Sequence, residues 1–246
     1  MKEGKIMVTY ASLSCQGNRE YNEDSIKLLQ KDKEYLFAVA DGLGGQGHGD
    51  IASQTAISAL NITSYDKDLQ SALAANLQEA QKAVCQKKSE ETCFDRMMTT
   101  LVLLQIREKS FAWGHIGDSR LYYFQDKKQK MQTSDHSVVQ KLVDAGMLKQ
   151  NEIRHHPDRN RLLSSVGMEW EDVPYELSDE IPRQKRQQFL LCTDGFWEYI
   201  EEEMMEKTLQ HAWTPGSWLK KMKHIVEKNG RHYNMDNYSA IAVWLK

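Results

Sequence analysis

The chain has 246 residues, a length that fits one large domain or two small ones and is sufficient to bury a substantial core. Lysine and arginine together number 32 and aspartate and glutamate 35, so the formal net charge is −3, which disfavours a protein that binds nucleic acid by neutralising phosphates. Hydrophobic residues make up 40% and charged residues 27%, which excludes a disordered chain and indicates a folded globular protein.

Strand-like runs rich in β-branched and aromatic residues are spread over the whole chain. They lie at residues 6–12, 35–40, 99–106, 111–117, 121–125, 188–193 and 238–245. Apolar residues at helical spacing predict helices from Leu69 to Val84 and from Trp218 to Val226, and shorter helices at 50–60 and 137–145. The polar residues 126–130 suit a hairpin turn. Because no linker or repeat divides the sequence, we predict one mixed α/β domain over residues 1–246, whose first and last thirds meet.

The ends of the sequence and its cysteines bear on the compartment. Residues 1–5 lead into no apolar stretch of signal-peptide length, and the longest apolar run, 35–40, is too short to cross a bilayer. The cysteines form no C-x-x-C pair, a pattern typical of free thiols in a reducing compartment; they are Cys15, Cys85, Cys93 and Cys192. We therefore expect a cytoplasmic protein without a membrane span.

Acidic residues gather at the ends of the predicted strands. A carboxylate at a strand end is held by rigid backbone, and a glycine after it lets the backbone approach a bound ion closely. Converging carboxylates repel one another unless cations are bound, and oxygen ligands favour Mg²⁺ or Mn²⁺ over zinc. A single Asp-Gly more often marks a turn, so the prediction of a metal site depends on the joint occurrence of these positions. They are Glu23, Asp24, Asp41-Gly42, Asp118, Asp194-Gly195 and Asp236-Asn237.

Five motifs in this order resemble the metal-dependent protein serine/threonine phosphatases of type 2C, in their compact bacterial form. They are Arg19-Glu20-Tyr21-Asn22-Glu23-Asp24-Ser25, Ala40-Asp41-Gly42-Leu43-Gly44-Gly45, Gly117-Asp118-Ser119-Arg120, Asp194-Gly195 and Asp236-Asn237. The stretches Asp135-His136-Ser137 and His156-Pro157-Asp158-Arg159-Asn160 also resemble the family. The resemblance runs from about residue 7 to 245. It implies an α+β fold, a four-layer α/β/β/α sandwich of two central antiparallel sheets flanked by helices.

The resemblance implies a site that holds two ions of Mn²⁺ or Mg²⁺. Asp41 would bridge the ions, the Gly42 carbonyl would serve one of them, and Asp194 and Asp236 would complete the other, which makes these three aspartates the catalytic candidates. The remaining candidate metal residues are Glu23 and Asp24, acting mainly through metal-bound waters, Asn237 beside Asp236, and Asp118, which would help to hold a third, weaker ion.

The implied reaction is attack on phosphorus by a water or hydroxide that bridges the two ions. Arg19 would bind the substrate phosphate, because a guanidinium fork suits its oxygens. The leaving group needs a proton, for which His48 is one candidate and metal-bound water the other, since Leu43 occupies the position where animal members carry a histidine. No cysteine begins a C-x₅-R loop, and Cys192 is expected to be a packed core thiol.

The resemblance also implies phosphorylated proteins as substrates, a bacterial serine/threonine kinase as the opposing enzyme, and a monomer that binds neither nucleic acid nor membrane. Two other functions stay open: a catalytically silent relative that binds phosphoproteins, and a phosphatase of a small metabolite. Residues 145–161 would form a mobile flap beside the site. Local patterns favour Asp135 or Ser134 as a helix N-cap, and His155-His156 as solvated surface rather than a zinc pair.

Overall fold

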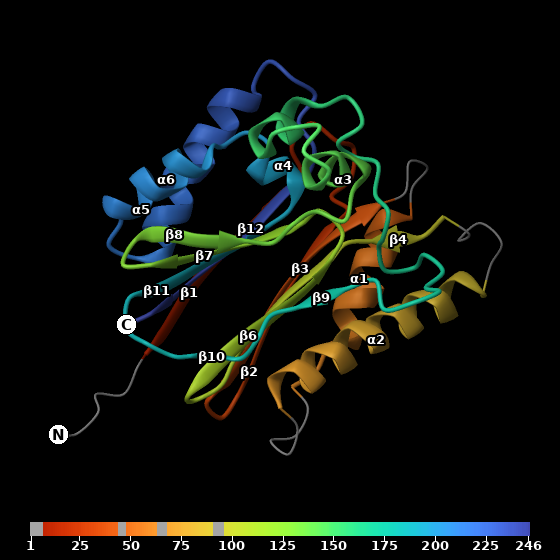
Figure 1. Ribbon diagram of the computed structural model, residues 1–246, viewed down its shortest axis with the longest axis horizontal. Coiled ribbons are helices and arrows are strands. Elements are labelled where there is room, and N and C mark those ends of the chain that lie inside the picture. Colours follow the sequence, from red (N-terminus) through yellow and green to blue (C-terminus); the bar gives the residue numbers. More distant parts are fainter. Residues whose placement is uncertain (1–6, 44–47, 63–67, 91–95) are drawn as a thin grey trace.

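The computed structural model describes residues 7–43, 48–62, 68–90 and 96–246. Two antiparallel β-sheets lie face to face, and helices cover the outer face of each sheet (Figure 1). The helices α1 (Gly49–Ala59) and α2 (Leu69–Lys88) cover one sheet, and α5 (Glu202–Gln210) and α6 (Pro215–Gly230) cover the other. This arrangement is the α+β four-layer sandwich that the resemblance to type 2C phosphatases implied.

The first sheet contains five strands in the order β1-β12-β11-β7-β8. Their bounds are β1 Val8–Cys15, β12 Tyr238–Leu245, β11 Gln187–Cys192, β7 Arg120–Gln125 and β8 Lys128–Gln132. The strands β1 and β12 pair over their whole length, from Val8 opposite Leu245 to Cys15 opposite Tyr238. The first and last parts of the chain therefore meet in one sheet, as predicted.

The second sheet has the order β10-β6-β5-β3-β2, and the short strands β4 and β9 pair with β3 and β6. The bounds are β10 Ile181–Pro182, β6 Ser110–Ile116, β5 Leu101–Ile106, β3 Glu34–Leu43, β2 Asp24–Lys31, β4 Met98–Thr99 and β9 Glu176–Leu177. The sequence did not predict β2. It is an edge strand that alternates polar residues with Ile26 and Leu28, which pack between the sheets, so it lacks the continuous apolar run of the central strands.

Three hydrophobic clusters fill the three interfaces between the four layers. Trp218 and Met222 of α6 pack against one face of the first sheet, Phe37 and Phe189 meet between the sheets, and Leu73 of α2 packs against the second sheet. Every residue of β5, β6, β11 and β12 is buried, since both faces of these strands are covered. This two-sided burial explains why these strands appear in the sequence as nearly unbroken apolar runs.

The helix α3 (Val138–Asp144) begins differently from the prediction. Its N-cap is Ser137, whose Oγ accepts a hydrogen bond from the backbone N of Gln140 at 3.2 Å. The prediction of Asp135 or Ser134 as the cap is wrong, because the carboxylate of Asp135 instead binds Arg120. The predicted hairpin turn at 126–130 is also shorter than expected: only Asp126 and Lys127 have positive φ angles, 53° and 63°, and β8 starts at the next residue.

The short helices α3 and α4 (Asp194–Trp197) lie close to one end of the sheets (Figure 1). The 3₁₀ helix η2 (Gln150–His155) follows α3 in the chain. No helix among the described residues is both long enough and apolar enough to cross a membrane.

Candidate active site

Asp24 and Asp41 lie directly opposite each other on the paired strands β2 and β3. Like charges at such positions destabilise a sheet, because opposite Cβ atoms are only about 5 Å apart. Thr193, which follows β11 in the other sheet, donates a hydrogen bond from Oγ1 to Asp24 Oδ2 at 3.0 Å. The two sheets therefore meet at this pair of aspartates.

Asp194 brings a third carboxyl group to the same place. It begins α4, directly after Thr193, and its carboxylate lies close enough to that of Asp41 to repel it. Burial raises the pKa of Asp41 well above its usual range, and repulsion from Asp194, Asp24 and Asp118 raises it further. Burial also raises the pKa of Asp194, with Glu198 and Asp236 adding repulsion.

Two oxygens of this cluster identify the kind of ligand that fits. Asp24 Oδ1 and Asp194 Oδ1 are buried and have no hydrogen-bond partner, although buried polar atoms in proteins nearly always have one. Divalent cations bound among these carboxylates would supply partners for such oxygens and offset the repulsion. Because the donors are carboxylate oxygens, the residues fit Mg²⁺ or Mn²⁺.

The glycines that follow Asp41 and Asp194 are required by close backbone contacts. A Cβ added to Gly42 would lie 2.1 Å from the carbonyl oxygen of Gly49, and one added to Gly195 would lie 2.1 Å from that of Asn237. The first contact places the start of α1 against the end of β3, and the second places α4 against the start of β12. Each Asp-Gly pair is therefore fixed to a neighbouring segment of the site.

Asn237 connects the loop before β2 to the start of β12. Its Oδ1 accepts from the backbone N of Glu23 at 2.8 Å, and its Nδ2 donates to the carbonyl oxygens of Gln16 at 2.7 Å and Tyr21 at 2.8 Å. The loop residue Arg19 donates from Nη2 to Asp236 Oδ2 at 2.6 Å. The first and last motifs of the sequence are thus joined.

Glu23 lies beside the start of α1. Its Oε1 accepts from the backbone N of Gly49 at 3.2 Å, and burial raises its pKa. His48 directly precedes this helix. Its neighbour in the chain is Gly49, whose backbone N binds Glu23. Gly44 and Gly45 of the second motif lie outside the described residues.

Asp118 approaches the cluster from the turn between β6 and β7. Burial, and then repulsion from Asp194 and Asp135, raises its pKa well above the usual range. Its carbonyl oxygen accepts a hydrogen bond from Trp197 Nε1 at 3.0 Å. The turn that carries Asp118 is therefore fixed to α4, which carries Asp194.

A buried ion pair supports this turn. Arg120 donates from Nε and Nη2 to the two carboxylate oxygens of Asp135, each at 2.7 Å, and its guanidinium lies 3.5 Å from the centre of the Trp197 ring. This pair was not predicted from the sequence. The available signal was an arginine at the start of an otherwise apolar strand, which requires a buried acidic partner.

The segment predicted as a flap is attached to α4 and α5. Arg154 is buried and donates to the carbonyl oxygens of Trp197 and Ile200 at 3.0 and 3.1 Å, and Arg159 binds the carboxylate of Glu198. Its mobility stays a prediction. Cys192 is buried in β11 and burial raises the pKa of its thiol, so the prediction of a core thiol is confirmed.

Comparison with known proteins identifies the family. Residues 13–237 match the sequence profile of the family Protein phosphatase 2C. The chain belongs to this family. It is 30% identical over 206 residues to the serine/threonine phosphatase stp of Listeria innocua, a match that covers 78% of this chain and 79% of the relative.

Solved structures of 2C-type phosphatases share the fold. The Mycobacterium tuberculosis serine/threonine phosphatase PstP/Ppp superposes with a TM-score of 0.85 at 28% identity, covering 98% of this chain and 99% of that one. The catalytic domain of PstP solved in complex with 2 manganese ions gives a TM-score of 0.83 at 26% identity, covering 98% and 99% of the two chains. The predicted family and fold are therefore confirmed.

Proposed function

We propose that this serine/threonine protein phosphatase hydrolyses phosphoserine and phosphothreonine in proteins at the aspartate cluster, with Asp41, Asp194 and Asp236 as its catalytic residues. The observation that carries the proposal is the buried group of Asp24, Asp41, Asp118 and Asp194, whose carboxylates repel one another and in which one oxygen each of Asp24 and Asp194 has no partner. Such a group is costly to a fold unless a cation binds to it. The ion pair between Arg19 and Asp236 places a guanidinium, which can bind phosphate, at the edge of the aspartate cluster.

We assign the ligand roles as follows. Asp41 and the Gly42 carbonyl would hold one Mn²⁺ or Mg²⁺ ion, Asp41, Asp194 and Asp236 a second, and Asp118 would help to hold a third. When bound, such ions lower the pKa of water and neutralise phosphate charge. Glu23 and Asp24 would orient water molecules around them, with Thr193 fixing the carboxylate of Asp24.

Two polar residues of the site take supporting roles. The amide of Asn237 is used in three structural hydrogen bonds, so we assign it a positioning role for the loop 16–23 instead of the ligand role that the sequence suggested. His48 stays the candidate general acid, supported by its position beside Gly49, whose backbone binds Glu23.

Replacing Arg19 by Ala should raise KM for a phosphothreonine peptide about tenfold or more and change kcat less. In the proposed role the guanidinium would contact ground-state phosphate as well as the transition state, and a hydrogen bond to a charged group is worth about 1.5–3 kcal/mol. Steady-state kinetics measure the effect, with the exposed Arg231→Ala as control. A variant with unchanged KM would show that Arg19 does not bind substrate.

We also propose the wider setting of the enzyme. The whole chain acts as one catalytic domain, because strands from both sheets supply the site, and it acts as a monomer that opposes a bacterial serine/threonine kinase. Its place is the cytoplasm, which suits the free thiols of Cys15, Cys85 and Cys192. The fourth cysteine, Cys93, lies outside the described residues.

Hydrolysis of a phosphothreonine peptide by the purified chain tests the function. We expect phosphate release with Mn²⁺ and none with excess EDTA, and a much higher kcat/KM for the phosphopeptide than for small phosphate esters of metabolites. A preference for the small esters would favour the metabolite phosphatase. Binding of the phosphopeptide without hydrolysis in Mn²⁺ would identify a silent relative, and hydrolysis that survives chelation would contradict metal dependence.

A further inference from the structure

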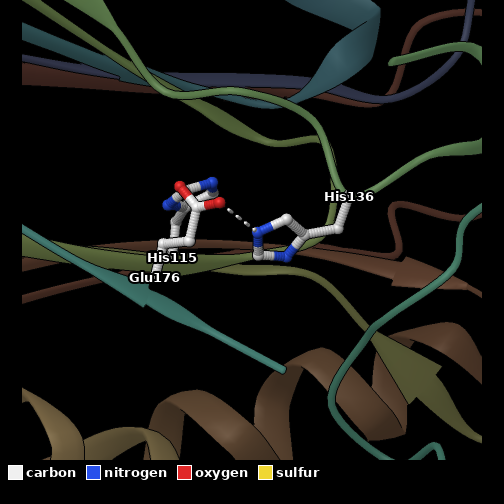
Figure 2. A group of neighbouring side chains, drawn as sticks. All are labelled: His115, His136 and Glu176. Atoms are coloured by element: carbon white, nitrogen blue, oxygen red, sulfur yellow. Dashed lines mark ion pairs between the residues drawn. The ribbon is translucent and has the colours of Figure 1, made fainter. Parts of the chain in front are cut away.

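A second group of potential metal ligands lies outside the aspartate cluster. It consists of His115 on β6, Glu176 on β9, and His136 in the segment between β8 and α3, and their ligand atoms lie within 4.8 Å of one another. His115 and Glu176 are opposite each other in the β6–β9 pair. In Figure 2 the His136 ring points toward the Glu176 carboxylate, and its Nε2 lies 3.7 Å from Oε1.

The hydrogen bonds of His115 leave one ring nitrogen available. Nε2 lies 2.9 Å from the carbonyl oxygen of Ser134, and because a carbonyl can only accept, Nε2 carries the proton. Nδ1 therefore has a lone pair, and it is buried without a hydrogen-bond partner. A histidine that donates from one nitrogen to a backbone carbonyl and leaves the other unprotonated is arranged as metal-binding histidines are.

Both imidazoles are held in the neutral form that binds metal. Burial lowers the pKa of His115. Burial, with repulsion from His115 and Lys141, lowers the pKa of His136 to about 3, so its pairing with Glu176 is not an ion pair at neutral pH. Metal binding to these rings would therefore not compete with a proton at pH 7.

We propose that His115 Nδ1, His136 Nε2 and Glu176 bind one Zn²⁺ ion at a site separate from the aspartate cluster. Two imidazoles and a carboxylate suit zinc, whereas the all-oxygen aspartate cluster suits Mg²⁺ or Mn²⁺. The 3.7 Å between His136 Nε2 and Glu176 Oε1 is close to the separation of about 3.3 Å that tetrahedral coordination needs. The Glu176 side chain is 63% exposed, which gives the ion an entry path and leaves room for water as fourth ligand.

Zinc would change one hydrogen bond next to the aspartate cluster. His136 Nδ1 now accepts from the backbone N of Gly117 at 3.3 Å. Coordination through Nε2 moves the ring proton to Nδ1, which then cannot accept from Gly117. Because Gly117 precedes Asp118, zinc binding is expected to alter the backbone amide signal of this turn.

Zinc titration of the whole chain in saturating Mg²⁺ tests the proposal. Calorimetry should give one Zn²⁺ per chain, with affinity at least about tenfold lower in the Glu176→Gln variant and lost in His136→Gln. The exposed residues Glu171 and His224 provide matched controls, since Glu171→Gln and His224→Gln should bind Zn²⁺ as the wild type does. Glu176 is exposed, so its substitution keeps the test valid even if His136→Gln folds poorly.

Two further measurements separate this site from the aspartate cluster. Co²⁺ in place of Zn²⁺ should give the visible absorption of a tetrahedral site in the wild type and not in Glu176→Gln. The amide signal of Gly117 should shift with Zn²⁺ in the wild type and in both control variants, and not in His136→Gln. Equal zinc affinity in all four variants would place the ion among the aspartates and overturn the proposal, as would no uptake in Mg²⁺. Neither result concerns phosphatase activity, so both are distinguishable from failure of the proposed function.

Discussion

Replacing Asp41 by Asn is expected to reduce kcat/KM for a phosphothreonine peptide by at least about 10³-fold at saturating Mn²⁺. Asp41 lies among Asp24, Asp118 and Asp194, and its substitution removes a negative charge that the proposed ions require. Charge stabilisation by a bound ion is worth several kcal/mol, and each 1.36 kcal/mol is a factor of ten in rate. Steady-state kinetics measure the loss, with the exposed Asp179→Asn as the control that should retain activity.

The same substitution should stabilise the metal-free protein at high pH. A carboxyl group whose pKa is raised by folding contributes stability below its unfolded pKa of about 3.9, and this contribution is lost as the pH rises through the folded pKa. The folded values are about 7 for Asp194 and about 8 for Asp24. In EDTA, the wild-type Tm should therefore fall between pH 5 and pH 8.5, and that of Asp41→Asn should fall less.

Two observations would contradict this account of Asp41. Parallel Tm curves for the wild type and the variant would show that repulsion within the cluster does not limit stability. An equal rise in Tm on addition of Mn²⁺ would show that Asp41 is not a ligand, because a ligand that binds only the folded state stabilises it according to its affinity. Loss of activity with both results would indicate a role other than metal binding.

The sequence predicted the positions of Asp41 and Asp194 because each directly follows an apolar run that is buried on both faces. It did not predict that Asp24 lies opposite Asp41, since this depends on an edge strand whose polar residues resemble a loop. Local patterns identified elements well where one strand or helix face determined them. They failed where the role of a residue depended on a contact with a residue distant in the sequence.

Asp135 and the proposed zinc ligands are two further cases in which contacts between distant residues were not predicted. A short polar residue before a helix is a good N-cap by local rules, but Asp135 has a buried arginine to neutralise, and Ser137 caps the helix instead. The residues His115, His136 and Glu176 are far apart in sequence: the pairing of β9 with β6 brings His115 and Glu176 together, and the hydrogen bond between Gly117 and His136 adds the third. Local patterns can show that a residue needs a distant partner, as for Arg120, but they do not show which residue that partner is.

Replacing Asp135 by Asn is expected to destabilise the fold by about 3–5 kcal/mol, because it leaves the charge of Arg120 buried without a partner. Both side chains are only 3% exposed, so solvent cannot compensate. Chemical denaturation measures the change, with Asp179→Asn as an exposed control. A loss below about 1 kcal/mol would show that water or Glu202, 3.9 Å from Arg120, replaces the lost carboxylate.

A double variant separates the stability of this pair from its role in the active site. Replacing both partners with apolar residues, Arg120→Met with Asp135→Leu, should recover most of the lost stability, since it removes both buried charges. It also removes the guanidinium that packs on Trp197, whose Nε1 holds the carbonyl oxygen of Asp118. We therefore expect a stable double variant with reduced kcat. Full activity would show that the turn carrying Asp118 keeps its position without Arg120, and that the buried pair serves the fold alone.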